Sequence, residues 1–215
     1  MEFEKLIYPG FNKTFGELEC FKLDKSKQLE VIDYFNIDWV RSAVEELVKT
    51  VDEKINIDGL NDSKKISVPK RKYLAEEIKA KAVAWSIGIS SPQEIDEINI
   101  LAASLQAMSR AVEGLEKKPD MILVDGMHAP ELDIPIKTII KGDALEKNIM
   151  AASILAKVYR DEYMIEVDKL HPDYGFKHHK GYPTKMHLEA LELHGITDEH
   201  RLTFKPVKKI YESNR

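Results

Sequence analysis

Two aspartates directly follow short apolar runs that are typical of buried strands. Asp125 comes after the run 121–124, and Asp143 ends a Lys-Gly-Asp segment behind a second short strand at 138–140. Taken singly, the Asp-Gly pair at 125–126 favours a turn, and Asp143 favours a helix N-terminus. Taken together, two carboxylates at strand ends of one sheet are the oxygen ligands that Mg²⁺ prefers. The sequence therefore predicts a divalent-metal site.

Basic residues gather in two segments that could contact phosphate groups. Residues 61–65 (NDSKK) place adjacent lysines beside small polar side chains, with a solvated turn as the alternative. Residues 175–182 (GFKHHKGY) frame basic side chains with glycines and end in an aromatic ring, which can pack on a sugar or base. The paired His178 and His179 could also indicate a metal site, but adjacent side chains rarely chelate one ion unaided. We therefore favour contact with nucleic acid.

The basic residues that could contact phosphate fall in three clusters along the chain. The net charge of the whole chain is −5, but phosphate contacts depend on local clusters. A single surface lysine, by contrast, is usually only solvated. The three clusters are Lys64, Lys65, Lys70, Arg71 and Lys72; then Lys177, His178, His179, Lys180 and Lys185; and finally Lys205, Lys208 and Lys209.

An α/β scaffold with a central mixed β-sheet flanked by helices is expected to position these segments, because strand and helix patterns alternate along the chain. Strands are predicted at 83–89, 121–124 and 138–140, with a hairpin within 16–35. Helices are predicted at 38–53, from Ser67 to about Lys81, from Ser91 to about Leu115 with a break near Asn99, at 146–169 and at 183–194. We expect one domain, in which residues 1–58 form an N-terminal hairpin and helix and 59–215 carry the site.

Composition narrows the class of protein further. No apolar run approaches the roughly 18–20 residues that a membrane span needs. The start, MEFEKLIYPG, lacks the basic and apolar regions of a secretory signal. The single Cys20 cannot form an internal disulfide, which fits a reducing compartment. We expect a cytoplasmic monomer.

From Gly59 to Phe204 the chain resembles type 2 ribonuclease H, the ribonuclease HII family. Many separate motifs follow in family order and at family spacing, so the resemblance is specific. The motifs are GLNDSKKIS (59–67), SPQEIDEINILAASLQAM (91–108), ILVDG (122–126), KGD (141–143), AASILAKVYRD (151–161), GFKHHKGYPTKMHLEAL (175–191) and HRLTF (200–204).

This resemblance implies a ribonuclease H-like fold and an endonuclease that cuts the RNA strand of RNA–DNA hybrids. Duplex DNA with embedded ribonucleotides is also an implied substrate. Cleavage would fall 5′ to a ribonucleotide and leave a 3′-hydroxyl and a 5′-phosphate. Family members use four carboxylates to hold two Mg²⁺ or Mn²⁺ ions, and Asp125 and Asp143 match two of the four.

Residues implied to contact nucleic acid lie in two of the family motifs. Tyr182 matches the tyrosine that packs on the deoxyribose at the RNA–DNA junction. Ser63, Lys64 and Lys65 match the loop near the nucleic-acid backbone, and Lys180 belongs to the Lys-Gly-Tyr loop.

The family's opening segment, GxDEAGRG, supplies the other two carboxylates and is not found in this sequence. Asp33 lies at a suitable spacing and is our preferred third catalytic and metal-binding residue, ahead of Asp52-Glu53 and Asp24. Two alternatives therefore stay open. One is a catalytically impaired protein that binds RNA–DNA hybrids, and the other is a remnant whose helix 38–53 mediates protein contacts.

Overall fold

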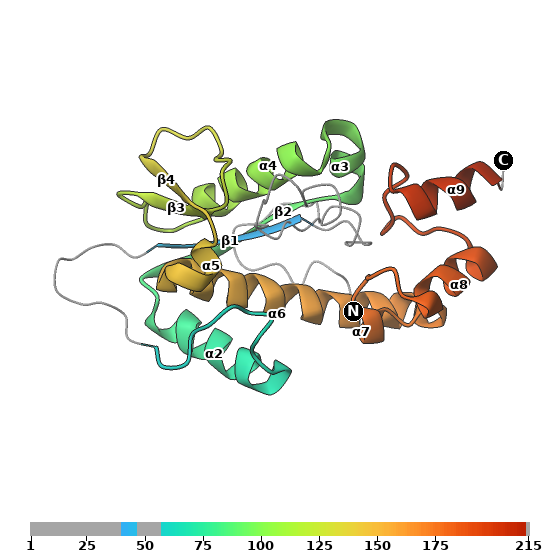
Figure 1. The fold of residues 1–215 in the computed structure, drawn as a ribbon, viewed down its shortest axis with the longest axis horizontal. Coiled ribbons are helices and arrows are strands. Elements are labelled where there is room, and N and C mark those ends of the chain that lie inside the picture. The colour runs from blue at the N-terminus through green and yellow to red at the C-terminus, as the bar shows by residue number, and fades with distance from the viewer. Residues whose placement is uncertain (1–39, 47–56, 214–215) are drawn as a thin grey trace.

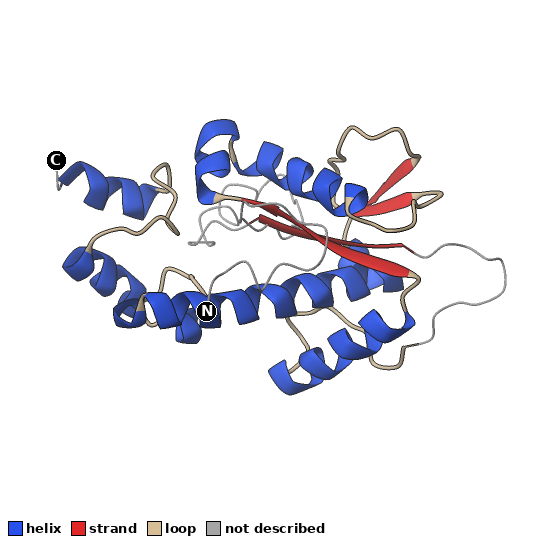
Figure 2. Ribbon diagram, turned by 180° about the vertical axis from the view of Figure 1, so that it is seen from behind, coloured by secondary structure: helices blue, strands red, loops and turns tan. Residues whose placement is uncertain are grey.

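Strands occupy the middle of the molecule and helices cover them from two sides (Figures 1 and 2). The computed structural model describes residues 40–46 and 57–213. The strands are β1 (Val40–Glu46), β2 (Ala84–Ser90), β3 (Ile122–Asp125) and β4 (Ile136–Ile139). The helices are α2 (Val68–Lys81), α3 (Pro92–Ile98), α4 (Ile100–Glu113), α5 (Gly142–Leu145), α6 (Lys147–Leu170), α7 (Phe176–His179), α8 (Lys185–His194) and α9 (Lys205–Ser213), with a 3₁₀ turn η2 at Pro172–Tyr174.

The described strands pair in both directions. β1 runs antiparallel to β2, with Val40 opposite Ser90. β3 runs parallel to β4, with Asp125 opposite Ile139. Helices α3 and α4 lie on one side of these strands, and α2 and α6 lie on the other (Figure 2). The predicted α/β class with mixed strand pairing is thus observed, as two strand pairs.

Alternation along β2 decides which helix packs on which face. Ile87 and Ile89 belong to the buried cluster that also holds residues of α2 and α6. The residues that alternate with them, Ser86, Gly88 and Ser90, are small. Gly88 lies so close to α4 that an added Cβ would be 1.8 Å from the Ala107 carbonyl oxygen. On the same face, the Ser90 hydroxyl donates to the carbonyl of Ala103 at 3.0 Å. Small residues on both elements therefore let α4 approach the strand closely.

The predicted break near Asn99 separates α3 from α4. Ser91 and Glu94 form the expected capping box at the start of α3. Asn99 has φ 70°, and its side chain accepts hydrogen bonds from the amides of Leu101 and Ala102. The asparagine therefore ends one helix and caps the next.

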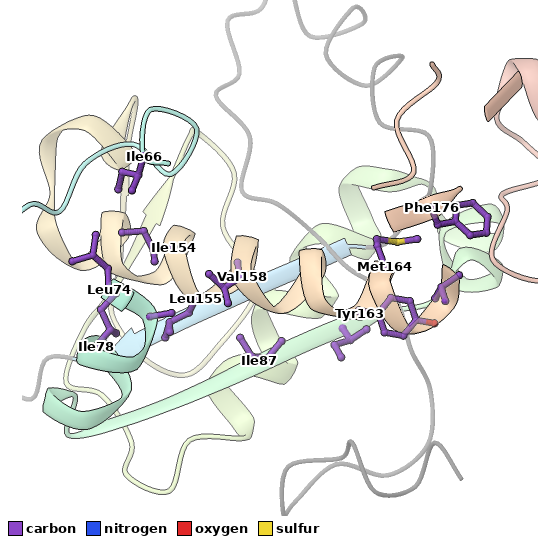
Figure 3. Close-up of a cluster of buried hydrophobic side chains, with 14 of the residues drawn as sticks. Ile66, Leu74, Ile78, Ile87, Ile154, Leu155, Val158, Tyr163, Met164 and Phe176 are labelled. Atoms are coloured by element: carbon purple, nitrogen blue, oxygen red, sulfur yellow. The ribbon is translucent and has the colours of Figure 1, made fainter. Parts of the chain in front are cut away.

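Helix α6 is the longest helix described and runs through the main buried cluster (Figure 3). Ile154 and Leu155 of α6 lie beside Leu74 and Ile78 of α2, whereas Met164 lies toward the other end of α6. The cluster extends from Ile66, next to the 61–65 segment, to Phe176 in the 175–182 segment. Helix α6 therefore connects the two basic segments.

The predicted helix at 38–53 is wrong, because residues 40–46 form strand β1. Val40, Val44 and Leu47 fit a helical period, but the β-branched valines also suit a strand. The backbone ladder to β2, which the sequence of this stretch alone does not specify, decides the outcome. The predicted hairpin at 16–35 lies outside the described residues.

Other boundaries agree within a few residues, and the short α5, α7 and the terminal α9 were not predicted. Among the described helices, none combines the length and the apolar character needed to cross a bilayer.

We predict that Gly88→Ala lowers the free energy of unfolding by about 3 kcal/mol, since the new methyl group must displace α4 backbone atoms. Gly114→Ala is the matched control, because Gly114 is an exposed helix-end residue with φ −77° and should change stability little. Urea unfolding of both variants measures the difference. Equal stabilities would contradict the close packing of β2 on α4.

Candidate functional site

A hydrogen bond joins the ends of the two parallel strands. Asp125 closes β3, and its Oδ1 accepts a hydrogen bond from the Gly142 amide at 2.7 Å. The Gly126 amide donates to the Ile139 carbonyl at 2.9 Å, which extends the β3–β4 pairing by one step. The next residue after Gly142 is Asp143, so the two aspartates predicted from the sequence lie at the same edge of this strand pair.

The backbone around Gly142 explains why the Lys-Gly-Asp segment has this composition. Lys141 adopts the left-handed conformation (φ 62°) and turns the chain from β4 into α5. A Cβ on Gly142 would lie 2.4 Å from Ile149 Cδ1, so glycine lets α6 pack against this turn. Asp125 is buried, and both Asp125 Oδ2 and Asp143 Oδ1 are shielded from solvent.

Carboxylate oxygens of this kind suit a hard divalent cation, so the chemistry of the donor set fits Mg²⁺ or Mn²⁺. Within residues 40–46 and 57–213, no group of three or more His, Cys, Asp or Glu side chains is arranged to hold a metal. The further candidates Asp33, Asp52-Glu53 and Asp24 lie outside the described residues. The described residues thus contribute two carboxylates.

The 61–65 loop is attached to α6 through Ser63. Ser63 is buried, and its hydroxyl lies 3.0 Å from that of Ser153. Asp62 organises the turn by accepting a hydrogen bond from the Lys64 amide at 3.0 Å. Lys64 and Lys65 are exposed. The loop therefore anchors its serine and presents its two lysines to solvent.

A buried charge network connects this loop to α6. The Asp161 carboxylate accepts hydrogen bonds from Arg71 of α2 at 3.1 Å and from Lys157 at 2.6 Å. Arg71 also donates to the carbonyls of Ser63 and Ile66, at 2.9 Å and 3.0 Å. Removing one partner of such a buried set would leave another charge uncompensated, so the network fixes the loop against the helix.

Tyr182 lies beside the same face of α6. The Lys157 ammonium and the Arg160 guanidinium lie 5.8 Å and 5.6 Å from the centre of its ring. Arg160 also donates to the Lys180 carbonyl at 2.9 Å. The two cations hold the Lys-Gly-Tyr loop on α6 through its ring and its backbone.

Lys180 is half-buried and has the left-handed conformation, with φ 51°. Burial lowers the pKa of Lys180, while the Asp161 carboxylate opposes this effect and the Lys157 ammonium reinforces it. An anion brought to this loop would therefore compensate a poorly solvated ammonium group.

The structure changes two assignments within the basic clusters. Arg71 and His179 are buried, at 7% and 6% exposure, and their side chains bond to the protein itself. Lys157, Arg160 and Asp161 also belong to the site, and the sequence alone assigned no role to them. The available signal was their spacing of three and four residues on one face of a helix that is otherwise rich in small apolar residues.

Comparison with known proteins finds relatives that match most of the chain. Residues 43–207 match the family model described as Ribonuclease HII. The chain is 55% identical to ribonuclease HII of Vibrio campbellii over 204 residues, which is 94% of this chain and 96% of that protein. It is also 53% identical to ribonuclease HII of Colwellia psychrerythraea over 166 residues, which is 72% of this chain and 76% of that protein.

The chain belongs to the ribonuclease HII family. It is therefore, by family, an endoribonuclease and a hydrolase. The family match begins at residue 43, inside β1, and so extends further toward the N-terminus than the resemblance from Gly59.

Solved structures support the fold. Ribonuclease H2 from Pyrococcus horikoshii aligns with a TM-score of 0.60 at 24% identity, over 72% of this chain and 81% of that one. A chain of the PCNA–ribonuclease HII complex from Archaeoglobus fulgidus aligns with a TM-score of 0.57 at 25% identity, over 71% and 80%. The predicted ribonuclease H-like fold is confirmed.

Two motifs shared with the ribonuclease HII family contribute histidines to the interior. His187 and His200 are 0% and 2% exposed. Burial lowers the pKa of His187 to about 4, with His179 adding to the effect. Burial likewise lowers the pKa of His200 to about 3, with His187 adding to it. Both rings are therefore neutral in the folded protein at ordinary pH.

These pKa shifts predict a loss of stability below neutral pH. An unfolded histidine takes up a proton near pH 6.5, whereas His187 and His200 do so only near 4 and 3 when folded. Their contribution to the free energy of unfolding is complete above pH 6.5 and falls as the pH decreases below that value. Each adds a slope of up to about 1.4 kcal/mol per pH unit. Urea unfolding between roughly pH 6.5 and 5, above the range of most carboxylates, measures it.

The variant His178→Gln is the control for this prediction, because the side chain of His178 is exposed. It should keep the slope of the parent protein, whereas His187→Gln should reduce it. A free energy of unfolding that stays constant between these pH values would show that the buried rings are not held neutral.

Proposed function

We propose that this chain acts on RNA–DNA hybrids as an endonuclease that hydrolyses the RNA strand 5′ to a ribonucleotide. Duplex DNA with embedded ribonucleotides is the second proposed substrate. The observation that carries the proposal is the Gly142–Asp125 hydrogen bond, which ties the Lys-Gly-Asp segment to the end of β3. The cytoplasmic location, the monomeric state and the boundary near residue 58 stay predictions.

Asp125 and Asp143 would hold the divalent metal, Mg²⁺ or Mn²⁺, with further ligands from the N-terminal segment. Asp33 is the candidate that the sequence favours there. Two ions held by these residues would supply an activated water and charge stabilisation for the leaving 3′-oxygen. The fit rests on two carboxylates of the oxygen type that these ions prefer, both with an oxygen atom shielded from solvent.

The protein's own contribution at this edge is to fix the carboxylates. The Gly142 amide holds Asp125 Oδ1 and thereby sets the plane of the carboxylate group. Because Gly142 also packs on Ile149, a shift of Asp143 relative to Asp125 would disturb the first turn of α6. Such rigidity matters because catalysis by positioning loses rate steeply when reacting groups move by about 1 Å.

The nucleic acid would lie along the face of α6 that carries the two attached loops. Lys64 and Lys65 are exposed and would contact phosphate groups, while the buried Ser63 holds their loop in place. The ring of Tyr182, backed by two cations, would pack on a sugar. Lys180, whose ammonium is poorly solvated, would pair with a nearby phosphate.

One observation favours the alternative, a hybrid-binding protein with impaired catalysis. The described residues bring two acidic groups to the candidate centre and no third. The phosphate-contacting loops do not depend on that centre, since they are attached to α6 by Ser63, Arg71 and Arg160. Hybrid binding without cleavage is the outcome that distinguishes this alternative.

We predict that Asp125→Asn abolishes Mg²⁺-dependent cleavage of a duplex with one embedded ribonucleotide. Loss of a metal-binding charge should lower the rate at least about a thousandfold, while hybrid affinity in Ca²⁺ changes little. Asp133→Asn is the matched control, because Asp133 is an exposed carboxylate in the β3–β4 loop. Gel assays of product and fluorescence anisotropy of binding measure the two quantities.

Retained cleavage by Asp125→Asn would contradict the proposed centre. If the unaltered protein binds hybrid tightly yet gives no product in either Mg²⁺ or Mn²⁺, the impaired hybrid-binding alternative replaces the nuclease.

We predict that Tyr182→Ala lowers kcat/KM on the same duplex by about tenfold to a hundredfold, whereas Tyr182→Phe retains most activity. Stacking of a ring on a nucleotide is worth about 1–3 kcal/mol and does not need the hydroxyl group. Steady-state kinetics of both variants measure it. Equal losses in Tyr182→Ala and Tyr182→Phe would instead assign the role to the hydroxyl.

A further inference from the structure

Three buried histidines, His179, His187 and His200, lie together against the Lys-Gly-Tyr loop. The rings of His179 and His187 stack with centroids 4.4 Å apart and planes 12° apart. His187 Nε2 lies 3.1 Å from His200 Nε2. Because these rings come from α7, α8 and the segment after α8, they connect three parts of the C-terminal region.

The hydrogen bonds along His200 and His187 fix where each proton lies. The Thr197 amide donates to His200 Nδ1 at 3.0 Å, so this nitrogen is an acceptor and His200 carries its hydrogen on Nε2. His200 Nε2 then donates to His187 Nε2, and His187 must carry its hydrogen on Nδ1. His187 Nδ1 donates that hydrogen to the Tyr182 carbonyl at 3.1 Å.

His179 holds the preceding residue of the same loop. Its Nδ1 accepts from the Gly181 amide at 3.2 Å, and its Nε2 donates to the Tyr174 carbonyl at 2.9 Å. Lys180 and Gly181 both have positive φ, 51° and 85°, so this backbone is in a conformation that a lysine rarely adopts. Contacts from outside the loop are needed to maintain such a conformation.

We call the hydrogen-bonded series His200–His187–Tyr182 carbonyl the histidine relay. Its His200 end is held by helix α3. The segment after His200 is bound to α3, because Asp96 accepts hydrogen bonds from the amides of Leu202 at 2.7 Å and Thr203 at 3.0 Å. A fixed His200 gives His187 a fixed partner. Hydrogen bonds and two or three residues of chain thus connect Asp96 of α3 to the Tyr182 carbonyl by way of His200 and His187.

We propose that His187, supported by His200, is a positioning residue that sets the Tyr182 backbone so that its ring is presented to the sugar of the substrate. This inference rests on the proposed function, in which Tyr182 contacts nucleic acid. His187 holds the main chain of Tyr182 by a hydrogen bond to its carbonyl, while Lys157 and Arg160 contact its ring. Both are required, because a ring on a freely moving backbone would keep its cations but lose its orientation.

Nitrogen NMR of the imidazole rings in the unaltered protein tests the relay without any substitution. We expect His187 in the Nδ1–H form and His200 in the Nε2–H form, with the exposed His178 as an internal reference. Histidine in water prefers the Nε2–H form, so an Nδ1–H signal from His187 is diagnostic. His187 in the Nε2–H form would overturn the proposal.

Two substitutions test the effect on the substrate. The amide of His187→Asn can replace the Nδ1–H donor to Tyr182, whereas His187→Gln places its amide toward His200 and loses that donor. We expect kcat/KM to fall about tenfold or more for His187→Gln and by less than about threefold for His187→Asn. In a Tyr182→Ala background, His187→Gln should cause almost no further loss.

A full additional loss in the Tyr182→Ala background would overturn the positioning role, because a merely structural defect acts independently of the ring. If the protein binds hybrid but does not cleave it, the same variants are compared by hybrid affinity. If it neither binds nor cleaves, the proposed function has failed, and the positioning role of His187 fails with it. The protonation forms of His187 and His200 then report only whether the relay is present.

Discussion

The hydrogen bond from the Gly142 amide to Asp125 Oδ1 is the contact on which the candidate centre depends. It joins the end of β3 to the turn that follows β4, and it orients a buried carboxylate that must otherwise be solvated or paired. The same glycine packs on Ile149, so the acidic edge and the start of α6 cannot move independently. A side chain at position 142 would force apart Asp125 of β3, the turn after β4 and Ile149 of α6.

Helix α6 connects the Gly142 turn to the 61–65 loop and the Lys-Gly-Tyr loop. Ile149, Ser153, Lys157 and Arg160 are three or four residues apart, so they lie along one side of the helix. They contact in turn the Gly142 turn, the 61–65 loop and Tyr182. At 1.5 Å per residue, Ile149 and Arg160 are roughly 16 Å apart, which corresponds to about five base pairs of duplex. The apolar residues of α6 pack in the main buried cluster.

The parts of the fold that the sequence predicts well are those specified by local patterns. The capping box at Ser91 and the apolar run that forms β3 depend only on neighbouring residues, and both are observed. The stretch 38–53 was predicted as a helix because its valines fit two periods. Pairing with β2, which is distant in the chain, made residues 40–46 a strand instead. Tertiary pairing overrides weak local preference there.

In the candidate site too, features set by local sequence could be predicted, and contacts between distant segments could not. Asp125 and Asp143 could be selected from the sequence because each follows a strand, and strand ends meet at one edge of a sheet. The Arg71–Asp161 bond and the histidine contacts join residues from separate segments, so no spacing in the sequence indicates that these side chains meet. The Lys157–Asp161 pair is different, because its four-residue spacing on α6 is visible in the sequence. Asp33 was selected by its distance from Gly59 and lies outside the described residues.

Anomalous diffraction from crystals of the full chain grown with Mn²⁺ and a non-cleavable hybrid tests the central claim most directly. We predict an anomalous peak at about 2.1 Å from carboxylate oxygens of both Asp125 and Asp143. An ion bound elsewhere, or no peak while the hybrid is bound and the two side chains are ordered, would contradict the assignment of these two aspartates as metal ligands.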